Sequence, residues 1–262
     1  MAILANKPTA LFVTLPRLRR VQTMIEIPEE TLNGALAGMM ELYLRTGVRV
    51  QSRPVGNDIS RRAAGDSNWG GAVQEGSGWT HVTGTVRVPN VSGQSPEAGA
   101  AGWVGIDGSK CRTGLLQTGF AVFGDGKIEA WYEWFPEPSY NYDDFKVSAG
   151  DELRLSVYSH GLHGGNSTIE NLTTGKAASH TFTDISEPLC LTDAEWIVED
   201  FSKGDQPVAF ADFGAMQFTD AYAEGDGGKV TPNGAQIMEV TVNGAPRTDC
   251  SANAEGVGCK YI

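Results

Sequence analysis

The chain has 262 residues, including 33 glycines and 12 prolines, and its formal net charge is −12. This composition suits short strands joined by tight turns better than a helical protein. The charge is uneven: residues 1–62 carry nine Lys and Arg against five acidic residues, a net +4, which leaves −16 on residues 63–262. So acidic a surface repels nucleic acid and anionic membranes, and we expect neither as a partner. No stretch approaches 18 apolar residues, so we expect no membrane span.

Residues 1–62 are predicted to form a basic N-terminal extension or pro-segment with one helix. Apolar residues recur at three-to-four-residue spacing along residues 28–47, and Gly47 is placed as a stop. The dibasic pair Arg61-Arg62 closes this part and is interpreted either as a processing site or as a solvated linker. The short apolar patch Ala10–Leu15 makes a poor signal peptide. Secretion is therefore inferred from the rest of the chain.

Residues 63–262 are predicted to form an all-β domain. From Trp69 onward, apolar and polar residues alternate, as in strands with one buried face. The clearest alternating sets are Val82, Val86 and Val88, then Leu153, Leu155 and Val157, then Met238, Val240 and Val242. Turn sequences such as Asp125-Gly126 and Asn243-Gly244 separate these runs. The pattern predicts an antiparallel β-sandwich.

Two strands, Leu115–Phe123 and Lys127–Phe135, are predicted to form a hairpin. A three-residue turn with a left-handed glycine would place Gln117 opposite Glu133. A two-residue turn would shift the pairing by one residue and reverse every face. We prefer the first, because carboxylates, an amide and aromatic rings then converge on one face, as a cleft for a polymer requires. That face of the second strand carries Glu129, Trp131, Glu133 and Phe135.

A further strand is predicted within Leu191–Phe201, with Glu195, Ile197 and Glu199 on one face. The four cysteines allow three pairings and form no CxxC motif, so two disulfides are expected. Cys250 and Cys259 would close a short C-terminal loop, leaving Cys111 with Cys190. This second bridge would bring Glu195 near Gln117. We expect both side chains to project from neighbouring strands into one open groove.

Four motifs occur in order along this domain: WVGIDG at 103–108, LQTGF at 116–120, WYEW at 131–134 and AEWIVEDF at 194–201. They closely resemble motifs of the fungal glutamic peptidases, or eqolisins. The likeness runs from Ser67 to Tyr261, about three quarters of the chain. It implies a sandwich of two large antiparallel sheets, related to the concanavalin A-like jelly roll, with a cleft on one sheet.

The resemblance also implies roles for individual residues. The catalytic pair of the family falls on Glu195 and Gln117, and its disulfides fall on Cys111–Cys190 and Cys250–Cys259. Residues that line the family's cleft fall on Trp69, Trp103, Asp107, Glu129 and Glu133; we place Trp131 and Phe135, which share the strand face, in the same cleft. Phe135 replaces a tyrosine of the family, Glu129 an aspartate, and Ala121 an acidic residue. These departures bear on specificity more than on activity.

The activity implied is that of an acid-acting endopeptidase with no covalent intermediate. Glu195 would take a proton from water and later give it to the leaving amine, while Gln117 would orient the water and bind the oxyanion. Glu133 would raise the pKa of Glu195 by like-charge repulsion. We expect polypeptide substrates, a secreted monomer, and no cofactor or metal. His160 and His163 lie in a glycine-rich loop that suits a metal site poorly.

Two other functions remain open from the sequence. A jelly-roll glycoside hydrolase would use Glu129 and Glu133 beside Trp131, although strand rise places their backbones about 13 Å apart. A non-catalytic binding module would use the same aromatic cleft. Three N-x-S/T sequons begin at Asn90, Asn166 and Asn171, and such triplets also arise by chance.

Overall fold

The computed structural model describes residues 66–203 and 206–262, which contain strands and no helix. The predicted helix within residues 28–47 and the junction near residue 62 lie outside these residues. No helix in the described part is long and apolar enough to cross a bilayer.

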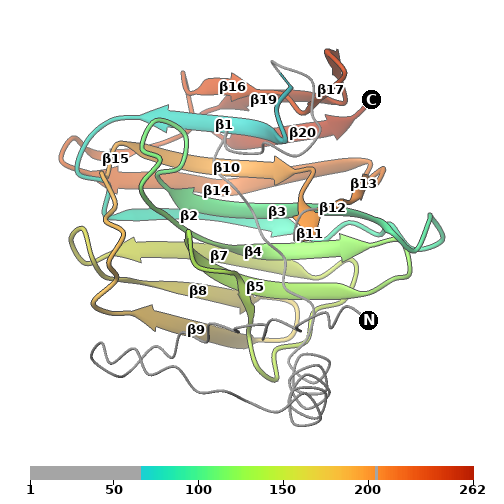
Figure 1. Ribbon diagram of the computed structural model, residues 1–262, viewed down its shortest axis with the longest axis horizontal. Helices are drawn as coiled ribbons and strands as arrows, with labels where there is room; N and C mark the ends of the chain where they lie inside the picture. The colour runs from blue at the N-terminus through green and yellow to red at the C-terminus, as the bar shows by residue number, and fades with distance from the viewer. Residues whose placement is uncertain (1–65, 204–205) are drawn as a thin grey trace, which may run out of the picture. The chain divides into compact units, whose positions relative to one another are not determined.

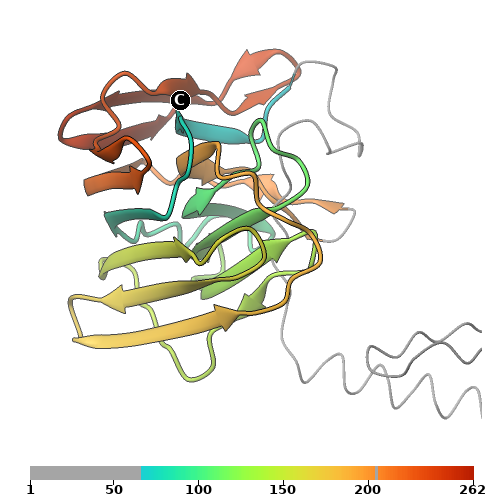
Figure 2. The ribbon, with the colours of Figure 1, turned by 90° about the vertical axis from the view of Figure 1, so that its left-hand side faces the viewer.

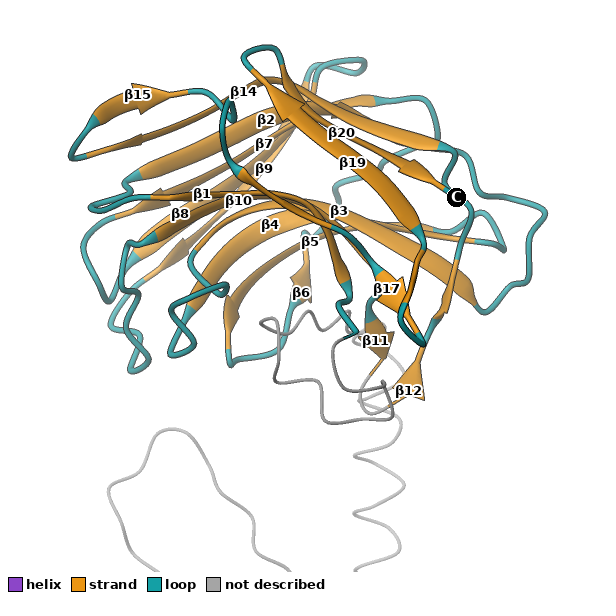
Figure 3. Ribbon diagram, turned by 90° about the horizontal axis from the view of Figure 1, so that it is seen from above, coloured by secondary structure: helices purple, strands orange, loops and turns teal. Residues whose placement is uncertain are grey.

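Two large sheets stack face to face (Figures 1 and 3). We call the first the site sheet. Its strand order is β16 (Gln236–Met238), β1 (Trp69–Glu75), β10 (Asp193–Glu199), β3 (Ala98–Ile106), β4 (Leu115–Phe123), β5 (Ile128–Phe135) and β6 (Tyr140–Asn141), with β13 (Ala209–Phe210) parallel to β3. The pairings along this order are antiparallel.

We call the second sheet the back sheet. Its order is β19 (Thr248–Asn253), β20 (Gly256–Tyr261), β14 (Ala215–Gly225), β2 (His81–Arg87), β7 (Glu152–Ser159), β8 (Gly165–Asn171) and β9 (Lys176–Phe182), with β15 (Gly228–Val230) beside β14. The described residues also form two small two-stranded antiparallel sheets. One pairs β11 (Ser202–Lys203) with β12 (Gln206–Pro207), and the other pairs β17 (Thr241–Val242) with β18 (Ala245–Pro246). The C-terminal strands lie at the opposite end of the sandwich from β8 and β9 (Figure 2).

The main hydrophobic core fills the space between the sheets, as period-two alternation predicts. On β4 the inward residues include Leu116 and Phe120, and on β10 they include Trp196. A second apolar cluster lies on the other face of the site sheet and contains Trp69, Val73, Ala101, Trp103, Leu115, Ala121, Phe123, Trp131, Ile197 and Phe201. The site sheet therefore carries apolar residues on both faces, and half of the outer cluster is aromatic.

The predicted hairpin is confirmed in turn and register, and its second strand begins at Ile128, one residue later than predicted. Phe123 donates its N–H to the carbonyl of Lys127, and Gly126 has a φ of 87°. Gln117 pairs with Glu133, which is the register of the three-residue turn. The alternating set at 238–242 is instead split between β16 and β17. Asn243 and Gly244, both with positive φ, form the predicted turn between β17 and β18.

Both predicted disulfides are present. Cys111–Cys190 joins the loop after β3 to the loop before β10, and Cys250–Cys259 joins β19 to β20. The sandwich fold expected from the alternation and from the motifs is thus confirmed.

Candidate active site

One row of residues crosses the outer face of the site sheet at the level of Glu195. Strand pairing places Val73, Glu195, Gly105, Gln117 and Glu133 side by side on β1, β10, β3, β4 and β5. Directly paired residues of antiparallel strands point to the same face. The row therefore presents two carboxyls and one amide, with a glycine between Glu195 and Gln117.

The expectation that Glu195 and Gln117 lie on neighbouring strands is wrong. They lie on β10 and β4, which flank β3. Strands are about 4.8 Å apart, so the two backbones are separated by about 10 Å. Gly105 occupies the intervening position and has no side chain to separate the carboxyl from the amide. The prediction of a shared depth holds, since both residues pair with Gly105.

The groove expected around this pair is not open. Glu195 and Gln117 have no exposed surface, and Glu133 is 1% exposed. The three side chains nevertheless point away from the space between the sheets, because Ile197, on the same face of β10 as Glu195, belongs to the outer cluster. Trp196, on the opposite face, belongs to the main core.

Burial governs the protonation of Glu195. It raises the pKa of this carboxyl well above its ordinary value, and the charges of Asp193 and then Asp107 raise it further. This electrostatic effect was expected from Glu133, whereas the charges responsible are those of Asp193 and Asp107. Within the described part of the chain, neither oxygen of Glu195 has a hydrogen-bond partner. A buried carboxyl without such partners favours its neutral form.

A second row lies two residues further along the strands, where Ile197, Trp103, Gly119 and Trp131 are paired. The Trp69 and Trp103 rings meet edge to face, with centroids 4.8 Å apart. The Nε1 atoms of Trp69 and Trp131 are buried and have no hydrogen-bond partner among the described residues. Three predicted cleft tryptophans thus stand on the outer face, and their role as substrate contacts stays a prediction.

A third row contains Glu199 and Glu129. Glu199 accepts hydrogen bonds from Trp103 Nε1 and from Asn68 Nδ2, each at 2.8 Å. Glu129 forms an ion pair with Lys127. Glu129 and Glu133 share one face of β5 in different rows, so they keep the wide backbone separation noted for the glycosidase alternative. Phe135 is partly buried beside the outer cluster.

Asp107 is bound to the backbone of its own chain. Its carboxylate accepts N–H bonds from Cys190 and Leu191 at 2.7 Å and from Thr192 at 2.8 Å, and a longer one from Asp193 at 3.3 Å. It also accepts the Thr192 hydroxyl at 3.1 Å. Asp107 therefore holds the loop that leads into β10, and its role as a substrate contact stays a prediction.

Sequence reasoning assigned no role in the site to three residues that the structure brings into this region, although it placed Glu199 on the same strand face as Glu195. Asn68 and Glu199 form the hydrogen-bonded group with Trp103, and Asp193 lies two residues before Glu195. Period-two spacing from Glu195 was a sufficient signal for Asp193 and Glu199. No local pattern in the sequence indicates that Asn68 meets Glu199, since these residues are 131 positions apart.

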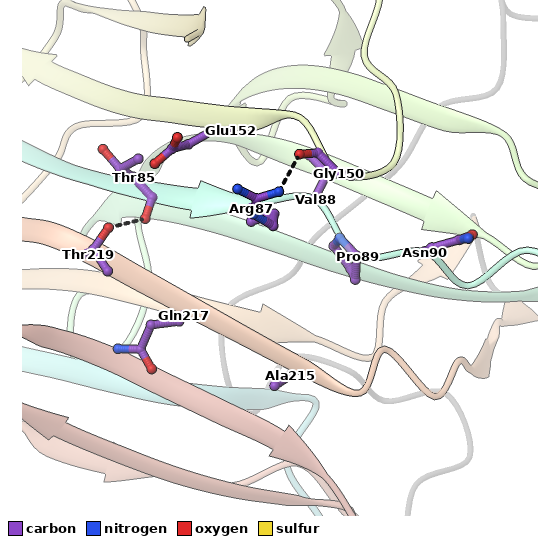
Figure 4. Close-up of a pocket in the computed structure, with 10 residues that line it drawn as sticks. All are labelled: Thr85, Arg87, Val88, Pro89, Asn90, Gly150, Glu152, Ala215, Gln217 and Thr219. Carbon is purple, nitrogen blue, oxygen red and sulfur yellow. Dashed lines mark hydrogen bonds between the residues drawn. The ribbon is translucent and has the colours of Figure 1, made fainter. Parts of the chain in front are cut away.

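A cavity of about 580 Å³ lies elsewhere, on the back sheet (Figure 4). It is lined by Thr85, Arg87, Val88, Pro89, Asn90, Gly150, Glu152, Ala215, Gln217 and Thr219. Its lining offers no pair of acidic groups and no nucleophile with an adjacent base. The chemistry is therefore assigned to the outer face of the site sheet.

Comparison with known proteins identifies the family. Residues 67–261 match the Peptidase A4 family. The chain is 42% identical over 219 residues to aspergillopepsin-2 of Aspergillus niger, covering 75% of this chain and 78% of that protein. It is 41% identical over 235 residues to scytalidopepsin B of Scytalidium lignicola, covering 84% and 90%.

Solved structures give the same result. A crystal structure of scytalido-glutamic peptidase with a transition state analog inhibitor has a TM-score of 0.71 at 43% identity, covering 74% of this chain and 98% of that one. Aspergilloglutamic peptidase from Aspergillus niger has a TM-score of 0.61 at 42% identity, covering 63% and 99%. The chain belongs to the peptidase A4 family, the eqolisins or glutamic peptidases.

Proposed function

We propose that this chain is an acid-acting endopeptidase in which Glu195 and Gln117 activate a water molecule across Gly105. Glu195 removes a proton from the water and returns it to the leaving amine. Gln117 orients the water and donates its amide N–H to the developing oxyanion. The attack needs no covalent intermediate, because the nucleophile is the water itself.

The observation that carries this proposal is the row Glu195–Gly105–Gln117. The glycine lets a carboxyl and an amide approach one point from two sides. The raised pKa of Glu195 keeps the carboxyl largely protonated in acid, which suits proton donation to the leaving amine, whereas removal of a proton from water uses the ionised fraction. The relatives include a scytalido-glutamic peptidase solved with a peptide based transition state analog, which supports a polypeptide substrate.

Mutation of the pair tests the proposal. The assay follows release of acid-soluble peptides from an unfolded protein at several acid pH values. It is run with and without prior incubation of the enzyme in acid, because Glu195 and Gln117 are buried. We expect Glu195→Gln to lower kcat about 10²–10⁴-fold and Gln117→Ala to lower it about 10²–10³-fold. Glu152→Gln, an exposed change on the back sheet, is the matched control. Unchanged turnover in the Glu195→Gln variant contradicts the proposal.

We also infer that the chain acts outside the cell, which its two disulfides support. The sequons offer a test. Asn90 is exposed in the loop after β2, whereas Asn171 is 1% exposed and donates Nδ2 to Asp151 at 2.7 Å. Secreted protein is expected to carry an N-glycan at Asn90 and none at Asn171. Peptide mapping after glycan removal measures this, and a glycan-free Asn90 counts against secretion by this route.

A further inference from the structure

Asp193 is a buried carboxylate that the proposed reaction does not use. It begins β10, two residues before Glu195, and so lies on the same face of the strand. Its Oδ2 accepts the backbone N–H of Lys110 at 2.7 Å and that of Cys111 at 3.3 Å. Its Oδ1 is buried and has no hydrogen-bond partner among the described residues. One oxygen thus holds the backbone and the other carries charge that is not compensated by a hydrogen bond.

The bonds of Asp193 are the reciprocal of those of Asp107. Asp107, at the end of β3, binds the backbone of residues 190–193, and Asp193, at the start of β10, binds the backbone of residues 110–111. The Cys111–Cys190 disulfide joins the same two loops. We call this arrangement the double clasp. It fixes the end of β3 against the start of β10, and hence Gly105 against Glu195.

We propose that Asp193 is a positioning residue for Glu195: through the double clasp it sets the place of β10 beside β3, and its negative charge acts on the Glu195 carboxyl. This inference rests on the proposed function of Glu195. Asp193 itself touches no reacting atom in this mechanism.

Among the other groups around Glu195, Asp107 acts on its carboxyl with the same sign but less strongly than Asp193. β1 presents the apolar Val73, and β4 presents the neutral Gln117. Charged groups are Asp107 at the end of β3 and Glu133 across the row on β5. Beyond Asp193, Lys110 forms an ion pair with Glu75 of β1, so its charge is partly neutralised.

The electrostatic part has a definite sign. Asp193 is the first charged neighbour, after burial, among the causes that raise the pKa of Glu195. Burial also raises the pKa of Asp193, although its bonds to Lys110 and Cys111 oppose this. Removing the charge makes the Glu195 anion easier to form. Because Glu195 must be ionised to accept a proton from water, the acidic limb of the kcat profile then moves to lower pH.

The test compares the pH dependence of kcat in three proteins. Asp193→Asn keeps one oxygen for the Lys110 N–H and removes the charge, and it has the shape of the protonated acid. We expect the acidic limb to move down by about 0.5–1 pH unit. Asp151→Asn is the matched control: Asp151 is also a buried loop anchor, which accepts Ser148 N–H and Asn171 Nδ2, but it lies next to the back sheet. Its variant should lose stability and keep the wild-type profile.

A structural role alone would lower activity by the same factor at every pH. A profile of Asp193→Asn that superimposes on the wild type after scaling overturns the proposal. Where turnover is too low to follow, carbon-13 NMR titration of the folded variant reports the Glu195 carboxyl directly, and an unchanged midpoint overturns it equally. Wild-type protein without peptidase activity would refute the proposed function instead, so the two failures are distinguishable.

Discussion

At the scale of single residues, two backbone positions near the site adopt a conformation that side chains disfavour. Asp107 has a φ of 72° and Leu191 a φ of 59°. Aspartate tolerates the left-handed region, whereas a leucine there costs about 1–3 kcal/mol. Asp107 accepts the N–H groups on both sides of this strained position, from Cys190 to Asp193. The carboxylate thus stabilises the conformation that starts β10.

Replacing Asp107 tests this account. Asp107→Ala leaves one buried and three partly buried backbone N–H groups without their acceptor, and a lost acceptor in a buried position costs about 1–3 kcal/mol. We expect a total loss of about 3–5 kcal/mol in the free energy of unfolding, measured by urea denaturation at acid pH. Asp107→Asn retains one acceptor oxygen and should lose less. If Asp107→Ala is as stable as the wild type, Asp107 is free to serve chiefly as a substrate contact.

At the scale of strands, glycines determine how closely β3 and β4 of the site sheet approach each other. A Cβ at Gly119 would lie 2.3 Å from the carbonyl oxygen of Gly102 and 2.5 Å from Trp103 Cβ, both on β3. At Gly105, a Cβ would lie 3.0 Å from Trp103 Cζ3 and from Leu115 Cδ1. The two glycines let β3 and β4 carry large rings beside the row that contains Glu195 and Gln117 without being forced apart.

Gly119→Ala is expected to separate β4 from β3 and to displace Gln117, two residues away. Overpacking of this kind costs about 1–3 kcal/mol, and a shift of the oxyanion donor lowers kcat as well. Thermal unfolding and kcat measured on the same preparation test both effects. The control is Gly227→Ala, because a Cβ at Gly227 meets nothing within 4 Å. Equal behaviour of the two alanine variants would contradict the packing argument.

The strands themselves were largely predictable, and their neighbours were not. Alternation gave the faces of β4, β5 and β10, and turn chemistry gave the Gln117–Glu133 register. β3 lies between β10 and β4, and its pairing with β10, which comes much later in the chain, leaves no local trace in the sequence. The burial of Glu195 and Gln117 was not predicted either. Alternation separates the two faces of a strand and does not reveal what covers either face.

At the scale of the whole molecule, acidic groups are distributed between a charged surface and a buried site. Residues 63–262 carry a formal net charge of −16. Glu195 and Asp193 are fully buried carboxyls with raised pKa values. Both features favour the folded state in acid. Surface repulsion is screened by salt, whereas the cost of ionising a buried carboxyl is screened much less.

This difference leads to a prediction about stability. A carboxyl whose pKa is raised on folding binds its proton more tightly in the folded state than in the unfolded one. Its contribution is complete below the unfolded pKa, about 4 for Asp and Glu, and is lost as pH rises through the folded pKa. We therefore expect Tm to fall from about pH 4 towards neutrality, and added salt to restore only part of the loss.

Since the double variant Glu195→Gln/Asp193→Asn cannot ionise at these positions, its Tm should depend less on pH than that of the wild type or of Asp151→Asn. Differential scanning calorimetry of the three proteins in low and high salt measures these Tm values. A wild-type Tm that rises towards neutral pH would contradict the assignment of raised pKa values to Glu195 and Asp193.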